Sequence, residues 1–90
     1  MRVLHLSDRL TARGGAHRHL LGLIEHQARG QDVGLAVGAR EPGVAAACPV
    51  FQVAGLEARE ARPVDLAPLA RAFRPDVVHV HTVVNPRALE

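Results

Sequence analysis

Residues 74–82 read Arg74-Pro75-Asp76-Val77-Val78-His79-Val80-His81-Thr82, and this stretch decides the fold. The proline ends the preceding helical pattern, and an acid then opens a run of β-branched residues. A short apolar run bounded by turn signals predicts a strand buried on both faces, as in a parallel sheet. Two polar residues, His81 and Thr82, stand at its carboxyl end, where ligands of open α/β sheets bind. We therefore expect His81 to face a binding crevice.

The residues before this stretch alternate between strand and helix patterns. Apolar runs predict further strands at residues 2–7, 32–38 and 49–54, and residues 76–81 form the fourth. Amphipathic spacing predicts a helix between the glycines at 14–15 and Gly30, and a second helix that Asp65 caps and Pro75 ends. Asn85-Pro86 predicts the start of another helix.

This order of elements predicts an α/β fold, a Rossmann-like parallel sheet of about four strands in the order 3-2-1-4 with flanking helices. The alternation of strands and helices and the right-handed crossover rule lead to that order. One tension concerns the link between the second and third strands. It has about ten residues, whereas a parallel crossover usually needs a dozen or more.

Composition narrows the classes of function. The formal net charge is +2, the eleven basic residues are all arginines spread along the chain, and only Phe51 and Phe73 are aromatic. A nucleic-acid-binding surface needs clustered basic residues or stacking aromatics, so we expect no nucleic-acid partner. The single Cys48 fits a reducing compartment and a small buried side chain. No segment has the length of a membrane span or the pattern of a signal peptide, so we expect a cytoplasmic protein.

The Gly14-Gly15 pair lies between the first predicted strand and the first predicted helix. Backbone N–H groups at a helix N-terminus favour an anion, and glycine lets a phosphate approach the backbone closely. Gly14 and Gly15 are therefore candidates for binding a phosphate group, although on their spacing alone a plain tight turn is the better explanation. The pattern is neither Gly-x-Gly-x-x-Gly nor a Walker loop, which disfavours dinucleotide binding.

Six histidines raise the question of a metal site. His79 and His81 share one face of a strand, and His5 can lie beside them on the first strand. Three imidazoles can bind zinc. We nevertheless expect no metal, because the three rings should lie at different heights along the sheet and no cysteine or carboxylate cluster joins them. The alternative for His5 and His79 is a hydrogen-bonded core histidine.

Three segments together resemble a known enzyme family: Met1-Arg2-Val3-Leu4-His5-Leu6, Gly14-Gly15-Ala16-His17-Arg18-His19-Leu20 and Arg74-Pro75-Asp76-Val77-Val78-His79-Val80-His81. In this order they resemble the start of the family 4 retaining glycosyltransferases, which have the GT-B fold. The resemblance runs over essentially the whole chain. It implies that residues 1–90 are part of a Rossmann-like N-terminal, acceptor-side domain, an incomplete half of a GT-B N-terminal domain.

The resemblance also implies an activity and a site. Such enzymes transfer a sugar from a nucleotide-diphosphate sugar to an acceptor with retention, and no metal or other cofactor is implied. The loop matching Gly14, Gly15 and Ala16 would approach the donor diphosphate or sugar. An acceptor-side cleft would then be lined by Ser7, His81, Thr82 and Asn85.

The chain departs from the family pattern in two ways. His17 stands where an acid is common, and the Glu-x7-Glu donor motif and a later catalytic histidine do not occur in these residues. We therefore expect the ninety residues alone to be inactive. No residue of this chain is assigned a catalytic role.

Two alternatives to a glycosyltransferase remain open. The parent could be a GT-B nucleotide-sugar epimerase, or the chain could be a non-catalytic Rossmann-like module that serves as an interaction surface. A parent enzyme could also associate peripherally with the inner face of the membrane. Finally, an apolar fourth strand at a sheet edge would pair with another copy, so self-association through residues 77–81 is expected of the isolated chain.

Overall fold

The structure is a computed structural model, and it describes residues 1–61, 63–81 and 83. Strands β1 (Arg2–Leu10), β2 (Asp32–Arg40), β3 (Val50–Gln52) and β4 (Val77–Val80) alternate with helices α1 (Gly15–Gln27) and α2 (Ala67–Phe73). The four strands form one sheet in the order β3-β2-β1-β4, and every neighbouring pair is parallel. The predicted Rossmann-like α/β architecture and strand order are confirmed. The expected helix at Asn85-Pro86 lies outside the described residues.

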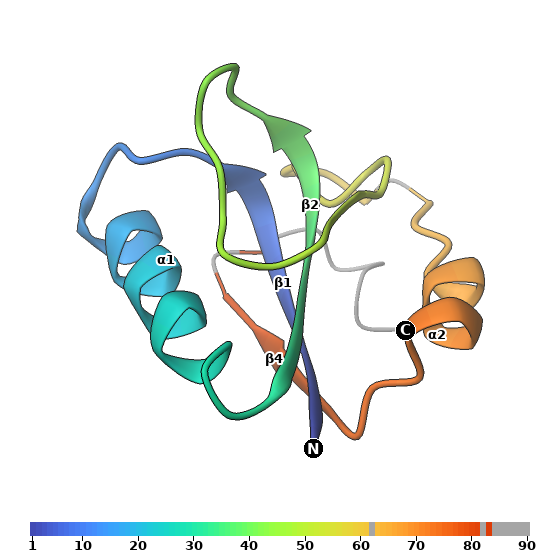
Figure 1. The fold of residues 1–90 in the computed structure, drawn as a ribbon. Coiled ribbons are helices and arrows are strands. Elements are labelled where there is room, and N and C mark those ends of the chain that lie inside the picture. Colours follow the sequence, from blue (N-terminus) through green and yellow to red (C-terminus); the bar gives the residue numbers. More distant parts are fainter. Residues whose placement is uncertain (62, 82, 84–90) are drawn as a thin grey trace.

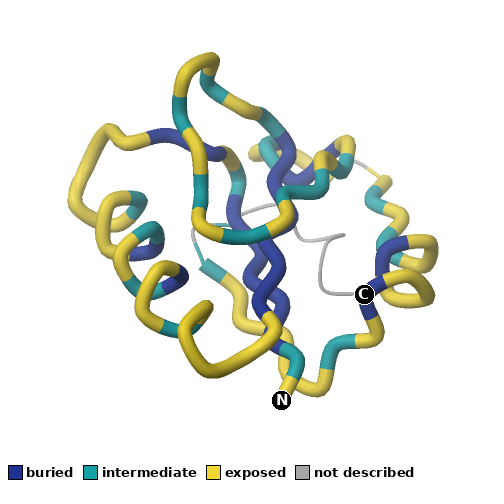
Figure 2. Tube along the Cα trace, in the orientation of Figure 1, coloured by how far each residue is buried: buried dark blue, intermediate teal, exposed yellow. Residues whose placement is uncertain are grey.

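The two helices lie on opposite faces of the sheet (Figure 1). On the α1 face, Leu20 and Ile24 of the helix pack against apolar side chains of the central strands. On the α2 face, Leu69 and Phe73 do the same. The buried residues concentrate along β1 and β2 (Figure 2). These two strands fix the frame on which any site is built.

The short link between β2 and β3 does form a parallel connection. It contains the nine residues 41–49, which have no helix. Val44, Ala46 and Cys48 instead pack against the core on the α1 face, so an extended segment covers the sheet where a crossover helix would otherwise lie. A link of this length is sufficient because it crosses the face without a helical turn.

The boundaries differ from the predicted ones at several points. β1 and β2 run to Leu10 and Arg40, beyond the predicted ends at residues 7 and 38, because their pairing continues through Leu10 and Arg40. β3 has only three residues instead of the predicted six, and they pair with Leu35–Val37 of β2. The N-cap of α2 is Leu66, although the Asp65 carboxylate accepts the Ala67 N–H at 3.0 Å.

The prediction that the fourth strand is buried on both faces is wrong. All four residues of β4 are exposed, with Val78 half exposed at 50%. The strand lies at the edge of the described sheet, and the two helices cover the central strands instead. An apolar sequence therefore forms an exposed edge strand here.

Candidate functional site

The carboxyl ends of the parallel strands carry the predicted site residues. α1 follows β1 on one face and α2 precedes β4 on the other, so the chain changes face between β1 and β4. Ligands of open α/β sheets bind at such a switch point. β1 and β4 are parallel, and the His81 N–H donates to the Leu6 carbonyl at 2.8 Å. His81 and the glycine turn therefore lie at the same edge of the sheet.

The two do not lie at the same level along β1. His81 is next to Leu6, whereas β1 continues to Leu10 before the glycine turn begins. At about 3.3 Å per residue, the turn starts roughly 13 Å further along the strand. The carboxyl edge of the sheet therefore carries two separate groups of polar residues.

The first group surrounds the glycine turn. Gly14 is the N-cap of α1 and has φ +82°, a conformation that favours glycine. Gly15 has no such φ, and a Cβ added there would meet nothing within 4 Å. Nothing in the described fold requires glycine at Gly15, so its small size is available to a ligand. Ala16 is exposed beside it, and the first-turn N–H groups have no acceptor within the helix.

A pocket of about 450 Å³ opens beside this turn. It lies between the ends of β1 and β2 and the start of α1, and its lining includes Arg9, Arg13, Arg40 and His17. Glu41 is the acid in the lining, and it accepts a hydrogen bond from the buried Thr11 hydroxyl and lies 3.3 Å from Arg13 Nε. We call these residues the arginine pocket. Three arginines against Glu41 and the adjoining Asp8, which pairs with Arg9, leave the arginine pocket with an excess of one positive charge.

Asp8 links the arginine pocket to α1. Its carboxylate accepts a hydrogen bond from His17 Nε2 at 2.9 Å and lies 3.6 Å from Arg9 Nε. The His17 ring is thereby held against the end of β1. Sequence reasoning missed Arg9, Arg13 and Arg40 as a group, because Arg40 is distant in sequence from the other two. Only the pairing of Leu10 with Arg40 brings it near Arg9 and Arg13.

The second group consists of His5, His79 and His81, which we call the histidine cluster. His5 is fully buried, its Nδ1 lies 2.9 Å from His81 Nε2, and its Nε2 lies 2.7 Å from Gln27 Oε1. The His79 and His81 ring centroids are 4.3 Å apart. The amide oxygen of Gln27 can only accept, so His5 Nε2–H donates to it and His5 Nδ1 accepts from His81 Nε2–H.

This convergence differs from the expectation that the rings lie at different heights. His5 and His79 are register partners and so share one row of the sheet. His81 is two residues further on, but its ring still reaches His5 Nδ1. The half-buried His81 thus contacts His5 and His79. The expectation that it faces a binding crevice stays a prediction.

The electrostatics of the histidine cluster favour neutral rings at His5 and His81. Burial lowers the pKa of His81 to about 4, and the nearby His79, His5 and His19 add to that shift. Burial also lowers the pKa of His5; the hydrogen bond with Gln27 opposes this shift and His79 reinforces it. At neutral pH, His5 and His81 therefore carry lone pairs rather than protons on one ring nitrogen each.

The other predicted residues are placed as follows. Ser7 is buried, and its hydroxyl donates to the Arg9 carbonyl at 3.3 Å. Thr82 and Asn85 lie outside the described residues. Burial raises the pKa of the Cys48 thiol to about 11, so Cys48 is not a nucleophile at neutral pH.

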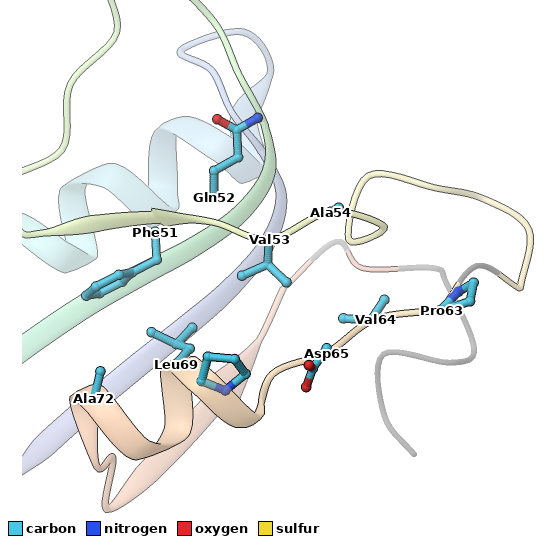
Figure 3. Close-up of a pocket in the computed structure, with 10 residues that line it drawn as sticks. Phe51, Gln52, Val53, Ala54, Pro63, Val64, Asp65, Leu69 and Ala72 are labelled. Carbon is cyan, nitrogen blue, oxygen red and sulfur yellow. The ribbon is translucent and has the colours of Figure 1, made fainter.

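A larger pocket of about 620 Å³ lies on the α2 face, beside the edge strand β3 (Figure 3). The side chains of Phe51, Val53 and Leu69 point toward one another there, between the end of β3 and α2, and Asp65 stands at one side. Its lining is mostly apolar and carries no arginine or histidine. This pocket belongs to the α2 face and is separate from both polar groups.

None of the helices in the described part of the chain is long and apolar enough to cross a membrane. Comparison with known proteins gives no family model, no curated protein and no solved structure that matches this chain. The functional argument therefore rests on the geometry of the site and on the sequence motifs.

Proposed function

We propose that this chain is part of the N-terminal, acceptor-side domain of a retaining glycosyltransferase that uses a nucleotide-diphosphate sugar. The observation that carries the proposal is the arginine pocket beside the glycine turn, at the carboxyl edge of a parallel sheet. A diphosphate is the ligand that suits a helix N-terminus, a glycine without steric demand and three guanidinium groups.

In this proposal the residues of the chain bind and stabilise charge. The first-turn N–H groups at Gly15 and Ala16 would face the diphosphate, and Arg9, Arg13 and Arg40 would neutralise it. Fixed donors aimed at a leaving diphosphate lower the barrier as its charge develops. The acceptor would lie toward β4, near His81, with Thr82 and Asn85 as further expected contacts. The residues that complete the reaction would come from outside residues 1–90, so the chain alone is expected to be inactive.

The same proposal places the protein in the cytoplasm, where nucleotide-diphosphate sugars are the donors, with the inner face of the membrane as the site of a lipid-linked acceptor. The half-buried thiol of Cys48 suits a reducing compartment.

Calorimetric titration with nucleotide-diphosphate sugars tests the proposal. The full-length gene product is titrated with uridine and guanosine diphosphate sugars, alongside a Gly15→Val and a Gly30→Val variant. Both glycines have open space for a Cβ and lack a positive φ; Gly15 begins α1, and Gly30 lies in the turn after it. Gly15→Val should weaken binding by at least about tenfold, and Gly30→Val should leave it unchanged. If none of these nucleotide-diphosphate sugars binds, the proposal is wrong.

A second candidate function is a non-catalytic interaction module. The observation that favours it is the exposed apolar edge strand β4, whose backbone can accept a further strand by β-augmentation. In that case nucleotide-diphosphate sugars should not bind, and a partner strand should protect the amides of β4 from hydrogen exchange.

A further inference from the structure

The histidine cluster brings together ligand atoms that are far apart in sequence. Within residues 1–61, 63–81 and 83, His5, His79 and His81 are the one group of three histidine, cysteine or acidic side chains close enough to share an ion. Their ligand atoms all lie within 4.8 Å of one another. The parallel register of β1 and β4 produces this convergence, because it pairs His5 with His79 and sets His81 beside Leu6.

His5 has the orientation of a metal ligand. Its Nε2–H donates to Gln27 Oε1, which fixes the tautomer and directs the Nδ1 lone pair toward His81. Histidines that bind metals usually donate their other ring N–H to an oxygen of this kind. Gln27 belongs to the last turn of α1, so the helix holds the ring from above the sheet.

The exposure of the three rings distinguishes a binding site from a core hydrogen-bond network. His5 is buried, His81 is half-buried and His79 is exposed, so the cluster opens to solvent on one side. An ion can enter from that side, and water can complete its coordination. A histidine network that served only the core would have no need of the exposed His79.

We propose that His5, His79 and His81 bind a divalent transition-metal ion, Zn²⁺ being the best match, with water in the fourth position. Imidazole nitrogen suits zinc, and three histidines with one open position are an established tetrahedral arrangement. Tetrahedral zinc holds its nitrogen ligands about 3.3 Å apart. The 2.9 Å separation of His5 Nδ1 and His81 Nε2 then needs to open by a few tenths of an ångström, as the ion replaces their hydrogen bond and the His81 proton moves to Nδ1. Ligand atoms as far apart as 4.8 Å need to approach by about 1.5 Å, which the exposed His79 ring allows. This proposal does not depend on sugar transfer.

The test titrates the tag-free, chelator-treated chain with Co²⁺, whose tetrahedral complexes absorb strongly in the visible, and then displaces Co²⁺ with Zn²⁺. His79→Gln is the main variant, because His79 is exposed and its loss should not disturb the core. His26→Gln is the matched control, since His26 is an exposed histidine of α1 and is not part of the cluster. Circular dichroism establishes that each variant is folded.

We expect one equivalent of Co²⁺ with a tetrahedral spectrum, and displacement by one equivalent of Zn²⁺. His79→Gln should weaken binding by at least about 100-fold, more than the loss of an outer-shell partner, while His26→Gln binds like the parent chain. Equal affinities in the two variants would mean that scattered surface histidines hold the ion, and this would overturn the proposal. An octahedral spectrum or the absence of binding would also overturn it.

A Gln27→Ala variant gives an independent measurement that leaves all three ligands in place. Removing the acceptor of His5 Nε2–H should weaken the metal complex by about 10–100-fold and shift the Co²⁺ spectrum. An unchanged affinity and spectrum would show that Gln27 does not orient His5 toward an ion, which contradicts the proposed geometry.

Discussion

The two faces of the sheet differ in the side chains that β1 buries on them, which are apolar on one face and include polar residues on the other. Toward α2, β1 presents Leu4 and Leu6, which pack with Ala36, Leu69 and Phe73 into an apolar core. Toward α1, the same strand presents the fully buried polar residues His5 and Ser7. Apolar burial supplies most folding free energy, whereas a buried polar group is neutral or costly unless it is hydrogen-bonded. Both faces bury an apolar core, but the buried polar side chains of β1 lie on the α1 face, which therefore carries the residues that can do chemistry.

Leu6→Ala should produce the largest loss of stability, because it removes a fully buried side chain from the α2 face. Chemical denaturation should show that the free energy of unfolding falls by about 2–5 kcal/mol. Val80→Ala is the matched control, since Val80 is the exposed register partner of Leu6 on β4. It should cost about 0.5 kcal/mol or less. Equal losses at the two positions would contradict the difference between the core and the edge.

Gly34→Ala tests how closely the α2 face is packed. A Cβ at Gly34 would lie 2.8 Å from Phe73 Cε1, so the ring has to move. The free energy of unfolding should fall by about 1–3 kcal/mol. Gly22→Ala is the control, because the exposed Gly22 of α1 has open space around its Cβ. It should raise the free energy of unfolding by about 0.5–1 kcal/mol. A stabilising Gly34→Ala would show that the face is loosely packed.

A pH series on the metal-free chain tests how the histidine cluster of the α1 face affects the free energy of unfolding. The pKa of His81 is about 4 in the folded chain and 6.5 ordinarily, so between these values the unfolded chain binds a proton that the folded chain does not. The free energy of unfolding should therefore fall as the pH drops from 6.5 to 4, by about 1 kcal/mol after allowance for solvent screening. Above pH 6.5 this contribution to stability is fully present.

Urea unfolding of the parent chain and of His81→Gln isolates that contribution, because carboxylates titrate equally in both. The difference between the two chains should shrink toward low pH. His26→Gln should follow the parent chain throughout. A difference that grows toward low pH would reverse the sign and contradict a lowered pKa at His81.

Val78→Glu should have the smallest effect on stability, about 0.5 kcal/mol or less, because Val78 is half exposed. Its effect on association should be larger. We propose that the exposed β4 edge pairs with a second copy, and a charge on an edge strand opposes such pairing. Light scattering at high concentration should give a larger mass for the parent chain than for Val78→Glu, with Arg71→Glu on α2 as a charge-matched control. A monomeric parent chain would count against pairing.

The sequence predicted the parallel order of strands because its elements alternate and its strands are apolar. It did not predict the exposure of Val77 and Val78, since a run of valines looks the same whether or not another layer covers it. It placed His79 and His81 on one face, but the approach of His81 to His5 depends on side-chain directions that spacing does not specify. Arg9 and Arg40 line the same pocket only because β1 and β2 pair, and no local sequence motif encodes that pairing.

Arg2 ties the first strand to the last. Its backbone N–H donates to Asp76 Oδ2 at 2.8 Å, its Nε donates to the Phe73 carbonyl, and its guanidinium lies over the Phe73 ring. These contacts span more than seventy residues, whereas β1 meets β2 after about thirty. During synthesis on the ribosome, β1 and β2 can pair early, but the last strand must emerge before the histidines can meet. Formation of that cluster would therefore report that β4 has joined the sheet, rather than that folding has begun.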